Sequence, residues 1–95
     1  MNYGIEIGHR AQNELQESAV FYELQSQGLG DRFLNAVYDT FEKIDANPEA
    51  FPIERNFRKA SVRHFPFLVL YRIQAESLVI LSVFHNKRNP KTKPR

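Results

Sequence analysis

The sequence contains no cysteine, no tryptophan and only four glycines among its 95 residues. Without cysteine, this chain can form neither a disulfide framework nor a metal site built on thiolates. Such a composition fits a reducing compartment, and we expect a cytoplasmic protein. The first residues, MNYGIEIGHRAQ, contain no long apolar stretch. They therefore predict neither a secretory signal nor a membrane span.

Four residue patterns that form active or ligand-binding sites in other proteins are also absent from the sequence. The glycines, at positions 4, 8, 28 and 30, fit no nucleotide-binding loop. The histidines, His9, His64 and His85, are far apart and form no HxxxH or HExxH motif. There is no nucleophile elbow, and the second half holds only Glu54 and Glu76 as carboxylates, which disfavours a paired-carboxylate site. We expect no metal and no cofactor.

The charges that are present are divided unevenly between the two halves of the chain. Residues 1–50 contain nine acidic residues and three basic ones, whereas residues 51–95 contain ten basic residues and two acidic ones. Such a division is typical of proteins that present an electrostatic working surface. The alternative is that the charges follow the individual helices and strands and have no binding role.

Two segments of the first half have the apolar period of helices. Residues 10–27 form the first, and its second half is apolar on almost every side, because Val20 and Leu24 lie opposite the main stripe. The second starts with Asp31 as its expected N-cap and ends near residue 46. The short glycine-containing turn between them predicts an antiparallel helix hairpin. We expect the core to include Tyr22, Phe33, Val37 and Phe41.

The remaining periodic segments are typical of strands. Residues 3–7 alternate in polarity, as residues 57–64 do more loosely, while residues 67–73 and 77–84 are apolar runs rich in branched side chains. The predicted fold class is α+β in the order β-α-α-β-β-β, with the helix hairpin packed on one face of a mainly antiparallel sheet. The pattern indicates a single domain, residues 1–95, with 91–95 as a mobile basic tail.

Basic residues accumulate in the strand region and continue past it: Arg55, Arg58, Lys59, Arg63, Arg72, His85, Lys87 and Arg88. Arginine presents a planar fork that suits phosphate or carboxylate, so a group of these residues on one sheet face would bind anions. Phenylalanines that could stack on nucleic-acid bases, at positions 57, 65 and 67, are assigned to the core instead. The candidates for binding a partner are Arg58, Lys59, Arg63, Arg72, Lys87 and Arg88, together with the apolar Val20 and Leu24.

Three stretches of the chain carry a family resemblance. They are VRHFPFLVLYRI, ILSVFHNKRNP and NELQESAVFYELQSQGLGDRFLNAVYDTFEKIDANPEAFP. In their order and spacing they resemble the RelE/ParE superfamily, the toxins of type II toxin–antitoxin modules, and the third is similar to the helix hairpin of the ParE-like, plasmid-stabilisation branch. The resemblance spans nearly the whole chain and implies the RelE/ParE toxin fold.

The resemblance implies a growth-inhibiting toxin that a cognate antitoxin holds inactive by wrapping around it in an oligomeric complex. It also implies one of two targets. RelE-like members cut mRNA in the ribosomal A site, whereas ParE-like members poison DNA gyrase and have no demonstrated catalytic chemistry. We expect a ParE-like toxin that acts on DNA gyrase. The alternatives are a RelE-like, ribosome-dependent mRNA endonuclease, or a small nucleic-acid-binding module without catalysis. No membrane partner is expected.

The residues near the C-terminus bear on the choice between these targets. Cutting RNA requires a base for the 2′-hydroxyl, cations around the phosphate and an acid for the leaving oxygen. The resemblance implies that basic sheet residues and a late tyrosine or histidine supply them. No tyrosine follows Tyr71, and residues 67–70 are uncharged, which favours the ParE-like interpretation. If the protein is a ribonuclease, His85, Arg63 and Arg88 are the expected catalytic set.

Overall fold

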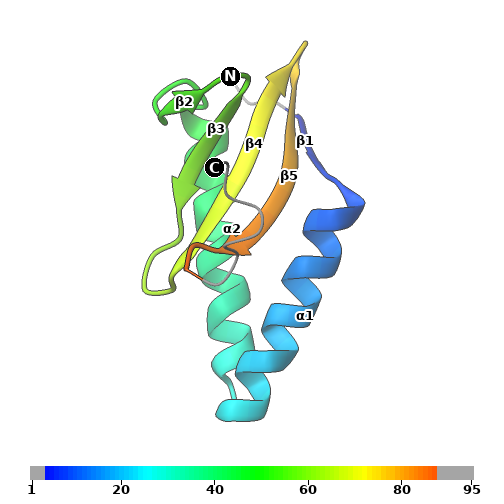
Figure 1. Ribbon diagram of the computed structural model, residues 1–95, viewed down its shortest axis with the longest axis vertical. Helices are drawn as coiled ribbons and strands as arrows, with labels where there is room; N and C mark the ends of the chain where they lie inside the picture. Colours follow the sequence, from blue (N-terminus) through cyan, green and yellow to red (C-terminus); the bar gives the residue numbers. More distant parts are fainter. Residues whose placement is uncertain (1–3, 88–95) are drawn as a thin grey trace.

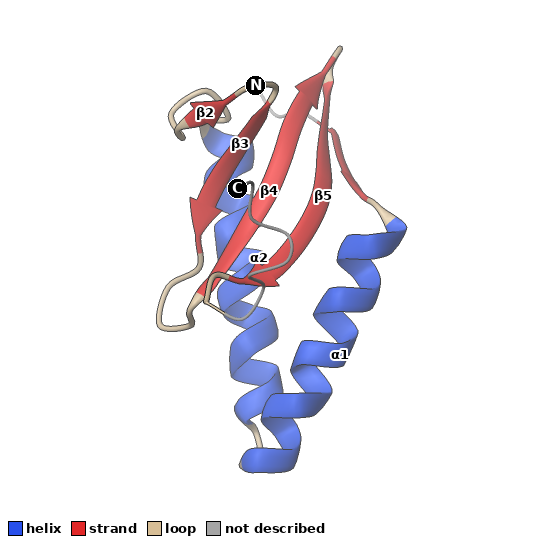
Figure 2. Cartoon of the chain, in the orientation of Figure 1, coloured by secondary structure: helices blue, strands red, loops and turns tan. Residues whose placement is uncertain are grey.

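The structure is a computed structural model, and it describes residues 4–87. The elements follow the predicted α+β order, with one additional short strand. Arg88 and the expected basic tail, 91–95, lie outside the described residues. The elements, drawn in Figure 1 and coloured by type in Figure 2, are β1 (Gly4–Ile7), α1 (His9–Gln25), α2 (Leu29–Ala46), β2 (Ile53–Glu54), β3 (Phe57–Ser61), β4 (Phe67–Gln74) and β5 (Ser77–His85).

The strands form one five-stranded sheet in the order β1-β5-β4-β3-β2. Strands β2 to β5 pair with their neighbours in antiparallel fashion, and only β1 is parallel to its neighbour, β5. The prediction of a mainly antiparallel sheet is therefore confirmed. The parallel pair joins the first strand to the last one, with Gly4 opposite Ser77 and Ile7 opposite Ile80. Strand β1 thus stops at the middle of β5, and no other strand of the described residues pairs with the rest of that edge.

The two helices pack on one face of the sheet, as predicted, and the turn that joins them extends beyond the sheet (Figure 1). The core lies between these layers and includes Phe33 and Val37 from α2 and Val69 and Tyr71 from β4, all fully buried. Tyr22 is partly buried and packs against Phe33 and Phe67 with ring centroids 5.2 and 6.1 Å apart. The predicted core residues Tyr22, Phe33, Val37 and Phe41 are confirmed.

The prediction that Asp31 caps α2 is wrong. The helix begins at Leu29, three residues earlier than an Asp31 cap implies, and Gly28 is its N-cap with a φ of 87°, a value that favours glycine. The Glu23 carboxylate takes the place of a local cap, because it accepts hydrogen bonds from the N–H groups of Gly28 (2.9 Å) and Gly30 (3.0 Å). These two bonds hold the pKa of Glu23 below its ordinary value of 4.5.

The loop that follows α2 is fixed to the sheet by two buried or partly buried polar side chains. The hydroxyl of Tyr71 donates a 2.7 Å hydrogen bond to the carbonyl oxygen of Pro48. Arg58 donates from Nη1 to the carbonyl oxygens of Glu49 (3.2 Å) and Phe51 (2.7 Å). Arg58 lies opposite Tyr71 in the sheet, so both side chains point to the helix side. This arrangement positions β2, which the sequence patterns did not predict.

Candidate functional site

The face of the sheet opposite the helices carries a groove of about 380 Å³. We call this surface the open-face groove. Its lining comes from four strands (β2 to β5), the β2–β3 turn, the turn after β5 and the start of α1. The residues are Arg10, Glu54, Arg55, Phe57, Lys59, Leu68, Leu70, Ser82, Phe84 and Asn86. Within residues 4–87 the helices cover only the other face and leave this groove uncovered.

The floor of the open-face groove is apolar because side chains alternate along each strand. Leu68 and Leu70 are partly exposed on this face, whereas their neighbours on β4 are buried under the helices. Phe84 lies directly opposite Leu68 across the β4–β5 pair, and Phe57 adds a second ring from β3. The expectation that position 57 belongs to the core is wrong: Phe57 lines the groove.

The rim of the groove carries three cations from separate elements: Arg10, Arg55 and Lys59. Lys59 forms an ion pair with Glu54 at 3.1 Å, and both side chains are largely exposed. Arg55 stands in the β2–β3 turn with a φ of 61°, in the left-handed region that non-glycine residues seldom adopt. The sequence predicted a cationic sheet face. The structure instead shows an apolar floor with cations around it.

Two of the predicted anion-binding arginines, Arg58 and Arg72, lie away from this groove. The guanidinium of Arg58 is directed to the loop carbonyls described above. Arg72 is exposed near the opposite end of β4. The two side chains border a separate hollow of about 540 Å³ at the sheet edge, with Ile53, Asn56, Ile73 and Gln74. Of the predicted basic set, Arg55 and Lys59 are the members that line the open-face groove among the residues that the structure describes.

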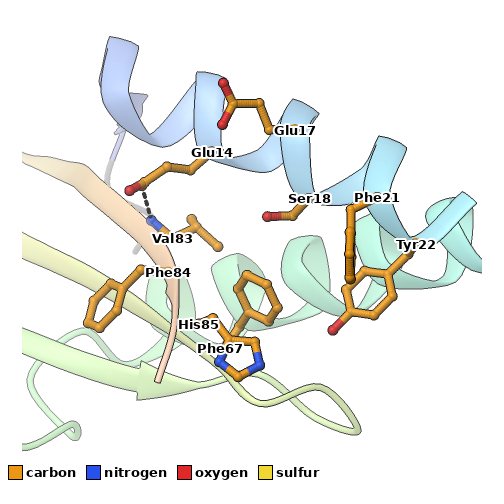
Figure 3. Close-up of a pocket in the computed structure, with 9 residues that line it drawn as sticks. All are labelled: Glu14, Glu17, Ser18, Phe21, Tyr22, Phe67, Val83, Phe84 and His85. Carbon is orange, nitrogen blue, oxygen red and sulfur yellow. Dashed lines mark hydrogen bonds between the residues drawn. The ribbon is translucent and has the colours of Figure 1, made fainter. Parts of the chain in front are cut away.

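A second cavity, of about 390 Å³, lies between α1 and the end of β5, and we call it the α1–β5 cleft (Figure 3). Glu14 reaches across it from α1 and accepts hydrogen bonds from the Val83 N–H and the Ser82 hydroxyl, each 2.8 Å long. The Arg10 side chain also bonds to Glu14, at 3.2 Å. This network joins the cleft to the rim of the open-face groove. The other lining residues are Glu17, Ser18, Phe21, Tyr22, Phe67, Phe84 and His85.

His85 lies at the end of β5 with its ring against Phe67, at 5.3 Å between centroids. Its Nδ1 accepts a 3.1 Å hydrogen bond from the Lys87 N–H, which leaves the proton of a neutral ring on Nε2. Arg63 is exposed in the loop that leads into Phe67, the cross-strand partner of His85. The structure therefore places Arg63, His85 and Lys87 at the same end of the sheet. Arg88, the third member of the expected nuclease set, lies outside the described residues.

The apolar residues predicted to face a partner are exposed on α1. Val20 is 55% and Leu24 is 83% exposed, one helical turn apart, and Phe21 beside them is 44% exposed. No other element of the described chain packs over this side of α1 strongly enough to bury them. The residues 13, 16, 17 and 20 border a shallow hollow of about 380 Å³ on the same side of the helix.

No group of three or more histidine, cysteine, aspartate or glutamate side chains suited to a metal ion exists within residues 4–87. In the same part of the chain, neither helix has the length and apolar character needed to cross a membrane.

Comparison with known proteins shows the family to which this chain belongs. Residues 5–90 match the sequence profile of the family described as "ParE toxin of type II toxin-antitoxin system, parDE". This match covers most of the chain. The chain belongs to the ParE toxin family. The predicted membership of the RelE/ParE superfamily is thereby confirmed. The predicted role as the toxin of a type II toxin–antitoxin system is confirmed as well.

Individual relatives agree with this family. Two proteins named Toxin ParE2, from the Mycobacterium tuberculosis strains CDC 1551 / Oshkosh and ATCC 25618 / H37Rv, are 29% identical to this toxin over 92 residues, which is 95% of this chain and 88% of theirs.

Two solved structures show the same fold. The chromosomal ParDE TA system from P. aeruginosa superimposes with a TM-score of 0.65 at 19% identity, over 87% of this chain and 95% of that one. The toxin–antitoxin complex RelBE2 from Mycobacterium tuberculosis superimposes with a TM-score of 0.64 at 23% identity, over 90% of this chain and all of that one.

Three residues of this ParE-family toxin were not recognised from the sequence alone. Phe57 and Phe84 had the apolar character of core residues, and only the pairing of the strands places them on the open face. Glu14 was one of several helix acids, and nothing in its neighbourhood indicated a contact with Val83. The helical spacing of Arg10 and Glu14, four residues apart, was the one available signal, because it predicts an ion pair.

Proposed function

We propose that this toxin inhibits growth by acting on DNA gyrase and that a cognate antitoxin holds it inactive by occupying the open-face groove. The observation that supports a non-catalytic toxin is the lining of the groove. It contains neither histidine nor tyrosine, and its only carboxylate, Glu54, is paired with Lys59. Such a surface offers contacts but no group suited to exchange protons with an RNA 2′-hydroxyl near neutral pH.

The chemistry of the groove also supports the nature of the antitoxin segment. Leu68, Leu70 and Phe84 supply an apolar floor, and Arg10, Arg55 and Lys59 supply positive charge around it. An amphipathic segment with apolar residues on one side and carboxylates along its edges would satisfy both parts. The two solved neighbours are themselves toxin–antitoxin systems, which supports a protein partner of this kind.

Controlled expression tests the proposal. Induction of the toxin alone is expected to stop growth, and co-expression of an acidic partner encoded beside it is expected to restore growth. Purified toxin should inhibit supercoiling by DNA gyrase or trap cleaved DNA, and the partner should reverse this effect. Normal growth on induction, or arrest with fully active gyrase in the presence of excess toxin, would remove the gyrase proposal.

The ribonuclease alternative is kept because one observation favours it. His85 and Arg63 lie at the same end of the sheet, where a phosphate could contact both. Primer extension on cellular mRNA after induction separates the two functions, since cuts in phase with codons indicate an endonuclease and intact messages with a DNA-damage response indicate gyrase. In the gyrase case His85→Ala keeps its toxicity, whereas an endonuclease that uses this imidazole loses most of its activity.

A further inference from the structure

A hollow lies where β4 extends past the start of β3, at the edge of the sheet away from α1 (Figure 1). The pairing of β3 with β4 ends at Arg58 opposite Tyr71, and residues 72–74 of β4 continue beyond it. The hollow has a volume of about 540 Å³, and we call it the edge hollow. Its lining contains two guanidinium groups and two amides but no carboxylate: Ile53, Asn56, Arg58, Arg72, Ile73 and Gln74.

One of the two guanidinium groups is already held in place. Arg58 is partly buried, and its Nη1 donates to the backbone carbonyl oxygens of Glu49 and Phe51. A guanidinium has further N–H groups on Nη2 and Nε, and within residues 4–87 no acceptor bonds to those of Arg58. The side chain therefore borders the edge hollow in a fixed position with donors to spare, so a ligand would not have to order it.

The charges around the edge hollow are not balanced. Residues 55–75 contain five lysines and arginines and no aspartate or glutamate. Neither Arg58 nor Arg72 forms an ion pair within residues 4–87. Two positive groups that border the same hollow repel each other, and an anion between them would remove this repulsion. The edge hollow is therefore suited to an anion.

We propose that the edge hollow binds a phosphate of duplex DNA, held between Arg58 and Arg72. This inference rests on the proposed function for the source of the ligand, because DNA gyrase works on duplex DNA and a toxin bound to the enzyme also lies near that DNA. The directions of the donors select phosphate. A carboxylate has two oxygens in one plane, which a single guanidinium fork satisfies, whereas phosphate oxygens point in several directions. The donors of the edge hollow come from β3, β4 and the β2–β3 turn, so they suit a phosphate.

The rival occupant is a protein segment rich in carboxylates. Such a segment also needs apolar contacts for its affinity. The edge hollow supplies two apolar side chains, Ile53 and Ile73, whereas the open-face groove supplies four. The open-face groove is the better site for an acidic segment, and a DNA backbone needs no apolar floor.

The test uses the purified full-length toxin and a fluorescent DNA duplex, with affinity measured by fluorescence anisotropy over a range of salt concentrations. Arg72→Ala is expected to weaken binding about fivefold or more at low salt and to reduce the slope of log K against log salt by about one, because one phosphate contact is lost. Gln74→Glu, which adds a carboxylate to the edge hollow, should weaken binding as well. Arg32→Ala removes the same charge from an exposed position on α2 and is the matched control, with unchanged affinity expected. Arg58 is not substituted, because it also fixes the loop after α2.

Circular dichroism checks that each variant is folded. If the wild-type toxin does not bind the duplex at low salt, or if Arg72→Ala binds it with the same affinity and the same salt slope, the proposal is overturned. A glutamate-rich peptide that displaces the duplex and depends equally on Arg72 would also overturn it and assign the edge hollow to a protein segment. Tighter binding of single-stranded RNA with the same dependence would overturn the choice of DNA.

A gyrase assay separates this inference from the proposed function. Arg72→Ala is expected to need about fivefold more toxin for the same inhibition of supercoiling, while it still co-purifies with the antitoxin. Equal inhibition by the wild type and Arg72→Ala would overturn the DNA contact and leave the gyrase proposal intact. If the wild type does not inhibit gyrase but binds the duplex through Arg72, the proposed function fails and the phosphate site stands.

Discussion

The carboxylate of Glu14 accepts a 2.8 Å hydrogen bond from the backbone N–H of Val83, so a helix side chain pairs with the edge of a strand. Strand β1 covers β5 only as far as Ile80. Beyond that point an unpaired strand edge would attract other chains. The bond from the Ser82 hydroxyl and the ion pair with Arg10 hold the carboxylate in place. Glu14 thus completes the edge that β1 leaves open.

Replacing Glu14 with alanine is expected to destabilise the toxin by about 2 kcal/mol, because the partly buried Val83 N–H and the Ser82 hydroxyl lose their acceptor. Glu14→Gln keeps an acceptor oxygen and should recover part of this loss. Urea unfolding followed by circular dichroism gives the values. Glu17→Ala, exposed one turn further along α1, is the control and should change stability by less than about 0.5 kcal/mol. Equal effects of the two alanine variants would show that the edge contact contributes nothing.

The Glu23 carboxylate should make the thermal stability of the toxin depend on pH between about pH 3 and pH 7. Its pKa is lowered in the folded state by the N–H groups of Gly28 and Gly30, so its contribution is complete above the ordinary value of 4.5 and disappears as the pH falls through the lowered value. Glu23→Gln is therefore expected to reduce Tm at pH 7 and to approach the wild type at pH 3. Thermal unfolding across this range measures the difference. A constant difference, or the same profile for the exposed control Glu42→Gln, would contradict the assignment.

Gly30 allows the two helices to approach closely. A methyl group there would lie 2.6 Å from the carbonyl oxygen of Ala19, whose backbone cannot move away easily. Although alanine ordinarily stabilises a helix relative to glycine by about 1 kcal/mol, Gly30→Ala is expected to lower stability by about 1–3 kcal/mol through this overpacking. Asn35→Ala, exposed on the same helix, should be neutral or slightly stabilising. Chemical unfolding of both variants tests the sign, and a more stable Gly30→Ala would show that the helices separate at little cost.

The hydroxyl of Tyr71 joins the centre of the sheet to the loop after α2. Burial raises the pKa of Tyr71, so the hydroxyl remains a donor to Pro48 through the neutral range. Tyr71→Phe is expected to cost about 1–2 kcal/mol, because the carbonyl of the buried Pro48 loses its partner. Tyr38→Phe, at a residue that is 47% exposed, is the matched control. Hydrogen exchange should show faster opening of residues 47–54 only in the Tyr71 variant, and unchanged protection there would contradict the role of this bond.

Some helices and strands were predicted from the sequence more accurately than others. The helices and long strands were predicted because their apolar periods are long and consistent, as with Phe33, Val37 and Phe41 on α2. Strand β2 was missed because it has two residues and owes its position to Arg58 and the loop after α2. The start of α2 was predicted three residues late, since aspartate is a common N-cap and the carboxylate that accepts from the first N–H groups, Glu23, belongs to the other helix.

The candidate site was predicted less well for a related reason. Val20 and Leu24, which the sequence predicted to bind a partner, are exposed on α1, and their binding role stays a prediction. The basic residues were expected on one face, but Arg58 points to the helix side, and only Arg55 and Lys59 of the predicted set line the groove among the described residues. Which side chains of a short strand face the helices depends on its register with the neighbouring strand. A single sequence does not show this register.

The sequence by itself determined the composition of each layer, the helix hairpin, the division of charge between the two halves and the family to which the chain belongs. These properties follow from local periodicity and from the order of residues along the chain. The tertiary structure decided which residues contact each other: Phe57 and Phe84 line a groove, and Glu14 closes the edge of β5. The reason is that contacts between residues up to 69 positions apart depend on strand pairing and helix packing, which only the folded chain fixes.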